Sequence, residues 1–143
     1  MNRHTDQKCV SQWTAAGIAT IATLWVGCSG SVADGAPPEA VRSAAEQHVG
    51  EAGGEMTFDD PTGDGRLTLA FDHVHDGVHV TEGGRQVVCV DFKSADGTVY
   101  DVDFYVDRAG TTDTLVVEDT VIHKVSGKNA LSDARRAELD RKG

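Results

Sequence analysis

Residues 85–107 read RQVVCVDFKSADGTVYDVDFYVD and decide the fold of the chain. Apolar and polar residues alternate on both sides of an Asp-Gly pair, which is the pattern of two strands joined by a tight turn. The apolar side chains of both halves share one face, so this face is expected to lie against a hydrophobic layer. The sequence therefore predicts an antiparallel hairpin with strands over 85–93 and 99–107.

The length of the turn determines which residues face each other across the hairpin. A two-residue turn would set Val102 against Asp91 and mix apolar with polar side chains on one face. A three-residue loop over 95–97, with Gly97 in the left-handed region, avoids this mixing. The predicted pairs are Phe92–Tyr100, Val90–Val102 and Val88–Phe104 on the apolar face, and Cys89–Asp103 and Asp91–Asp101 on the polar face.

Further elements are expected on both sides of the hairpin. Residues 66–81 and 114–125 alternate as strands do, and the apolar phase of 66–81 flips near Asp72, which indicates a bulge. Residues 38–49 begin with proline, carry apolar residues at helical spacing and end at Gly50, so they predict a helix. The expected fold class is α+β, with one N-terminal helix packed on a four-stranded antiparallel meander.

Composition divides the chain into four parts. We expect a signal peptide over 1–27, a lipidated cysteine and flexible tether over 28–38, the α+β domain over 39–127, and a tail or short helix over 128–143. The net charge of -10 opposes non-specific attraction to nucleic acid or to anionic lipid headgroups. We therefore expect no nucleic-acid partner.

The leader contains the uncharged run WTAAGIATIATLWV over 13–26. A helix of this length rises about 21 Å, short of the roughly 30 Å hydrocarbon core, so the run is typical of a signal peptide and not of a membrane span. Residues 24–28, LWVGC, resemble the lipobox of bacterial lipoproteins, which ends in the lipidated cysteine. The resemblance implies a cell-envelope protein held on a membrane by lipid on Cys28, and Ser29 resembles the outer-membrane sorting pattern.

A second cleavage site competes with the lipobox. The small residues Ser31 and Ala33 fit an ordinary secretory site, and cleavage there would release a secreted or periplasmic protein. If Cys28 is lipidated instead, Cys89 is the only thiol of the mature domain, because Cys9 lies in the leader. The domain would then contain no intramolecular disulfide.

The order of the elements resembles cystatin-like and NTF2-like architectures. The domain also looks like a type of small bacterial lipoprotein domain through the stretches VHDG over 74–77, CVDF over 89–92, YDVDF over 100–104 and IHK over 122–124. These architectures host enzymes and binding proteins alike, so the resemblance implies no activity. We expect a non-catalytic binding or accessory domain, whose partner is an envelope protein or a small ligand.

The polar face of the hairpin is one candidate site. His73, His75 and His79 share one face of their strand if it is unbroken, and a three-residue loop over 83–85 would place His79 opposite Cys89. Imidazole, thiolate and carboxylate are ligands of zinc, and the same groups serve a cysteine nucleophile. The predicted ligands of zinc or copper are His75, His79, Cys89 and Asp103, with His73 and Asp91 as further candidates.

Two alternatives accompany this metal site. A solvated polar face needs no ligand, and no residue is assigned a catalytic role. His123, between Val121 and Val125, is expected to be a packing residue. On the apolar face, an NTF2-like pocket between helix and sheet would hold a small ligand and be lined by Val88, Val90, Phe92, Tyr100, Val102 and Phe104.

Overall fold

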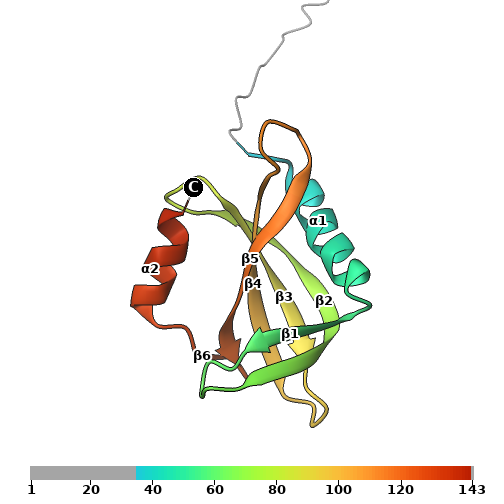
Figure 1. Ribbon diagram of the computed structural model, residues 1–143, viewed down its shortest axis with the longest axis vertical. Coiled ribbons are helices and arrows are strands. Elements are labelled where there is room, and N and C mark those ends of the chain that lie inside the picture. Colours follow the sequence, from blue (N-terminus) through green and yellow to red (C-terminus); the bar gives the residue numbers. More distant parts are fainter. Residues whose placement is uncertain (1–34, 143) are drawn as a thin grey trace, which may run out of the picture. The chain divides into compact units, whose positions relative to one another are not determined.

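A computed structural model describes residues 35–142, so the signal peptide, Cys28 and most of the tether lie outside the described residues. The elements follow the order α1 (Pro38–Glu51), β1 (Glu55–Asp59), β2 (Arg66–Val80), β3 (Gln86–Lys93), β4 (Val99–Arg108), β5 (Leu115–Val125), β6 (Lys128–Asn129) and α2 (Asp133–Arg141). The strands form one antiparallel sheet in chain order. The two helices lie on opposite sides of this sheet (Figure 1).

The prediction of one helix on a four-stranded meander is wrong. The four predicted strands correspond to β2–β5, but β1 and β6 extend the sheet to six strands and α2 adds a third layer. The two additional strands are short, with five and two residues, so they carry little alternation. Helix α2 buries only Leu139, and a single apolar contact gives no periodic pattern that would predict its packing.

The predicted register of the central hairpin is confirmed. Residues of β3 and β4 pair as expected, with Cys89 opposite Asp103 and Asp91 opposite Asp101. The backbone N–H of Ser94 donates to the carbonyl oxygen of Thr98 at the base of the loop. Gly97 has a φ of 84°, the left-handed conformation that the three-residue loop requires.

The hydrophobic core fills the space between α1 and the sheet. Val41, Ala45 and Val49 form the buried stripe of α1, and Phe92 contacts the rings of Phe58, Phe71 and Phe104 from the sheet side. Of the six residues that were predicted to line a ligand pocket, Tyr100 packs at the margin of this core. The other five are completely buried in it: Val88, Val90, Phe92, Val102 and Phe104. Side chains therefore occupy the place of the predicted pocket.

Helix α2 covers part of the opposite face of the sheet. Its side chain Leu139 packs on Val87 and Tyr105, which are both buried. The carbonyl oxygen of Asp140 accepts a hydrogen bond from the N–H of Gly83 at 3.0 Å. A Cβ atom at Gly83 would lie 2.9 Å from that same oxygen, so this close approach of α2 to the β2–β3 loop requires glycine.

We expect Val102→Ala to lower the free energy of unfolding by about 2 kcal/mol. Val102 has no exposed surface, and the variant loses two buried carbon atoms and leaves a cavity. Val80→Ala is the matched control because Val80 is 66% exposed, and its effect should stay within about 0.5 kcal/mol. Urea denaturation followed by circular dichroism measures both values, and equal losses would contradict the described core.

Candidate functional site

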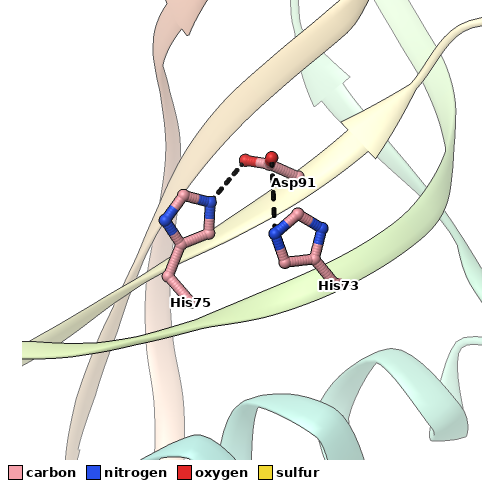
Figure 2. Close-up of side chains that lie close together, drawn as sticks. All are labelled: His73, His75 and Asp91. Carbon is pink, nitrogen blue, oxygen red and sulfur yellow. Dashed lines mark hydrogen bonds and ion pairs between the residues drawn. The ribbon is translucent and has the colours of Figure 1, made fainter.

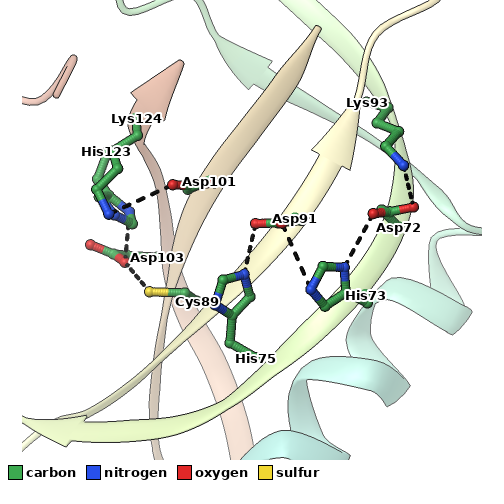
Figure 3. Close-up of polar contacts among 10 residues, drawn as sticks. All are labelled: Asp72, His73, His75, Cys89, Asp91, Lys93, Asp101, Asp103, His123 and Lys124. Carbon is green, nitrogen blue, oxygen red and sulfur yellow. Dashed lines mark hydrogen bonds and ion pairs between the residues drawn. The ribbon is translucent and has the colours of Figure 1, made fainter. Parts of the chain in front are cut away.

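The polar face of β2–β5 carries a row of ionisable side chains (Figure 3). The opposed carboxylates of Asp91 and Asp101 would repel each other if nothing compensated their charge. Each carboxylate has a partner on the strand that flanks the hairpin. His75 on β2 contacts Asp91, and the ammonium group of Lys124 on β5 lies 3.7 Å from Asp101. The row divides into an exposed histidine cluster on the β2 side and a buried cysteine cluster towards β5.

The exposed cluster consists of His73, His75 and Asp91 (Figure 2). The Nε2 atom of His75 lies 2.9 Å from Oδ1 of Asp91, and Nε2 of His73 lies 3.7 Å from Oδ2. The two imidazole rings are stacked, with centroids 5.0 Å apart and an interplanar angle of 4°. One donor atom from each residue lies within 4.8 Å of the other two, so all three can reach one ion.

Asp72 holds His73 from the side opposite Asp91. Nδ1 of His73 lies 3.1 Å from Oδ2 of Asp72, and Nζ of Lys93 donates to Oδ1 of Asp72 at 2.7 Å. The hydrogen bond from Lys93, followed by that from His73, keeps the pKa of Asp72 below its ordinary value. Asp72 therefore stays ionised and accepts the Nδ1 hydrogen of His73, which directs Nε2 towards Asp91.

Two irregularities interrupt β2 around the histidines. The predicted bulge is present, since Phe71 pairs with Phe92 and His73 pairs with Asp91, which leaves Asp72 as an extra residue. A second irregularity follows, because three residues, 75–77, lie between the pairs Val74–Val90 and Val78–Val88. Bulges redirect side chains, and the bulge at Asp72 turns His73 to the polar face opposite Asp91. His75, two residues further along the strand, faces the same side.

The buried cluster consists of Cys89, Asp103 and His123. The Cys89 thiol donates to Oδ1 of Asp103 at 3.1 Å, and Nδ1 of His123 lies 2.9 Å from the same oxygen. Nη1 of Arg136, from α2, lies 3.4 Å from Oδ2. Burial alone would raise the pKa of Asp103, but these three neighbours outweigh it and hold the pKa below its ordinary value.

The geometry of the buried cluster does not fit a cysteine nucleophile. A nucleophilic cysteine needs a base such as histidine against its sulfur, whereas Asp103 lies between Cys89 and His123. Burial, and then the negative charge of Asp103, raise the pKa of Cys89 to about 12. The thiol is therefore protonated at neutral pH, and thiol nucleophilicity requires the thiolate.

The predicted metal ligands fall into separate places. Cys89 and Asp103 are together as predicted, but His75 belongs to the exposed cluster. The placement of His79 opposite Cys89 is wrong: the β2–β3 loop spans five residues, 81–85, so His79 pairs with Val87. His79 nevertheless lines the pocket of about 290 Å³ that borders the buried cluster and α2.

His123 is the site residue that sequence reasoning missed. In the pairing of β4 with β5, Asp101 faces Lys124 and Val102 faces Ile122, so His123 is an extra residue in a bulge. The bulge allows His123 and Lys124 to reach the same polar face. The only signal in the sequence was the consecutive pair His-Lys, which interrupts the alternation of this strand.

Comparisons with models of protein families, with curated proteins and with solved structures found no match for the chain. The resemblance to bacterial lipoproteins and to cystatin-like and NTF2-like architectures therefore stays a prediction. Among the described residues, neither helix has the length and apolar content needed to cross a membrane.

We expect the thiol of Cys89 to react with iodoacetamide far more slowly in the folded protein than in urea. A pKa of about 12 in place of 9.0 leaves about a thousandfold less thiolate at pH 8. Because the pKa of the thiol is higher in the folded state, unfolding should increase the fraction of thiolate and therefore the reaction rate. Mass spectrometry of the Cys89 peptide, with EDTA present, measures the rate. Equal rates in both states would contradict the half-buried thiol that donates to Asp103.

Proposed function

We propose that this chain is a bacterial cell-envelope lipoprotein whose folded domain binds a transition-metal ion at His73, His75 and Asp91 without catalysing a reaction. The observation that carries the metal site is the convergence of two imidazole Nε2 atoms on one carboxylate (Figure 2). The envelope address is supported by the resemblance of residues 24–28 to a lipobox and by the tether that follows.

The tautomer of His73 favours a cation at this position. When Nδ1 of His73 donates its hydrogen to Asp72, the tautomer with no second hydrogen carries its lone pair on Nε2. That lone pair then faces the negative Oδ2 atom of Asp91 at 3.7 Å. Two acceptors facing each other are unfavourable unless a proton or a metal ion lies between them. A divalent ion would satisfy both acceptors. Nε2 of His75 now donates to Oδ1 of Asp91 at 2.9 Å, and it can ligate the ion once that hydrogen leaves.

The donor set indicates the class of ion. Imidazole suits zinc, copper and nickel, and a single carboxylate beside two imidazoles is an established zinc ligand set. Ligating histidines commonly donate their other ring nitrogen to a carboxylate, which is the role that Asp72 plays for His73. The side chains of His73 and His75 are 57% and 42% exposed, so a bound ion would be open to exchange with solvent or with a partner.

Copper binding tests the histidine site. In the full chain with all three cysteines replaced by serine, we expect one equivalent of Cu²⁺ with nitrogen hyperfine structure from two imidazoles in electron paramagnetic resonance. His75→Ala should remove one imidazole and weaken binding at least tenfold, and Asp72→Asn should weaken it roughly tenfold.

His79→Ala is the matched control for this experiment. His79 lies on the same strand and is exposed, but it is not part of the cluster with Asp91. Copper that binds equally well to His75→Ala and to His79→Ala would contradict the site. If the protein binds no copper after equilibration with excess Cu²⁺, the metal-binding proposal is wrong, and an accessory or scaffolding role in the envelope is the remaining proposal.

The anchor has its own test. We expect Cys28→Ala to move the protein from the membrane fraction to the soluble fraction of a bacterial host, because the lipidated cysteine is the proposed attachment. Ser29→Ala is the control and should stay with the membrane. A mature N-terminus at Asp34 would instead assign the cleavage to the secretory site at Ala33.

A further inference from the structure

We propose that Cys89, Asp103 and His123, whose side chains lie together in Figure 3, form a second metal site for a thiophilic ion such as Zn²⁺. The site lies between the sheet and α2, from which Arg136 contacts Asp103. This site differs from the histidine cluster in its ligand chemistry, because it contains a sulfur atom and is buried. It shares no residue with the exposed cluster, so the two sites can be tested independently.

An unpaired nitrogen in the buried cluster points to a missing ligand. The side chains of Asp103 and His123 are only 4% and 8% exposed. Nδ1 of His123 has no hydrogen-bond partner, although it lies 2.9 Å from the Asp103 carboxylate, so this contact lacks hydrogen-bond geometry. Buried polar atoms are nearly always hydrogen-bonded. An ion bound to Nδ1 would satisfy this nitrogen.

The donor atoms already have nearly the spacing of a metal site. Sγ of Cys89 lies 3.1 Å from Oδ1 of Asp103, and the sulfur, carboxylate oxygen and Nδ1 all lie within 4.8 Å of one another. Zinc bond lengths place tetrahedral ligand atoms roughly 3.3–3.8 Å apart. Shifts of about 1 Å or less would therefore bring the three atoms to ligating positions around one ion.

The pocket beside the cluster supplies access and a fourth position. It has a volume of about 290 Å³ and is lined by Cys89, Asp103 and His123 together with His79 and Arg136. A water molecule can complete a tetrahedral site with three protein ligands.

Binding exchanges the thiol proton for the ion. The S–H bond of Cys89 breaks, the proton passes to solvent, and a sulfur–metal bond forms with no change in oxidation state. One thiolate and one carboxylate then neutralise Zn²⁺. The ion competes with Arg136 for Asp103, and Arg136 can move into solvent because its side chain is already 39% exposed.

Cobalt binding tests this site through its sulfur. In the full chain with Cys9→Ser and Cys28→Ser, we expect Co²⁺ to produce a thiolate-to-metal charge-transfer band that Zn²⁺ abolishes. Cys89→Ser retains a group that can hydrogen-bond to Asp103 and should lose the band. His123→Gln should keep the band but weaken Co²⁺ binding at least tenfold, and circular dichroism verifies that each variant is folded.

Arg136 and its neighbour provide a matched pair of variants. Arg136→Gln removes the competing charge from Asp103 and should tighten Co²⁺ binding about two- to fivefold. Arg135→Gln should leave the affinity unchanged, because Arg135 pairs with Glu138 on the exposed side of α2. Equal effects of both variants would overturn the role of Arg136.

The outcome separates this site from the histidine cluster. A charge-transfer band that persists in His75→Ala supports the buried site even if copper binding at the exposed cluster fails. Absence of the band in the folded protein, its persistence in Cys89→Ser, or its loss in His75→Ala would each overturn the buried site.

Discussion

The pairing register of β3 with β4 is the constraint on which the domain depends. The three-residue loop with Gly97 in the left-handed region sets Val90 against Val102 and, one step along, Cys89 against Asp103. A slip of one residue would expose the whole apolar face and bury the acidic one. The core under α1 and the polar row on the other face are therefore two consequences of the same turn.

Bulges in the two flanking strands then adapt this regular hairpin to a site. On β2, the bulge at Asp72 turns His73 to the polar face, and His75 follows at the next position on that face, so both contact Asp91. On β5, the extra residue His123 reaches Asp103 beside Lys124. Regular strands place successive residues on opposite faces, so without the bulge His123 and Lys124 would not share the polar face. The exposed site thus combines Asp91 of the regular hairpin with two histidines that follow a bulge, and the buried site combines Cys89 and Asp103 of the hairpin with the bulge residue His123.

The acidic face is stable because each carboxylate has a local partner. Asp72 contacts Lys93, Asp101 lies near Lys124, and Asp103 is held by His123, Cys89 and Arg136. The last of these contacts comes from α2, which lies at the far end of the described chain. A buried carboxylate is costly unless it is paired and hydrogen-bonded. The helix therefore covers the sheet and also helps to hold Asp103 in its ionised form.

The sequence by itself determined the central hairpin, its register, its two faces and the bulge near Asp72, because alternation and turn chemistry are local properties. Tertiary structure decided the elements and side-chain positions that local sequence patterns do not predict. The strands β1 and β6 pair with neighbouring segments of the chain but are too short to show alternation. Helix α2 packs on Val87 and Tyr105, which are distant in the sequence. The five-residue loop places His79 opposite Val87, away from Cys89. The bulge in β5 places His123 beside Asp103. Both features are defined only when the neighbouring strands are in place.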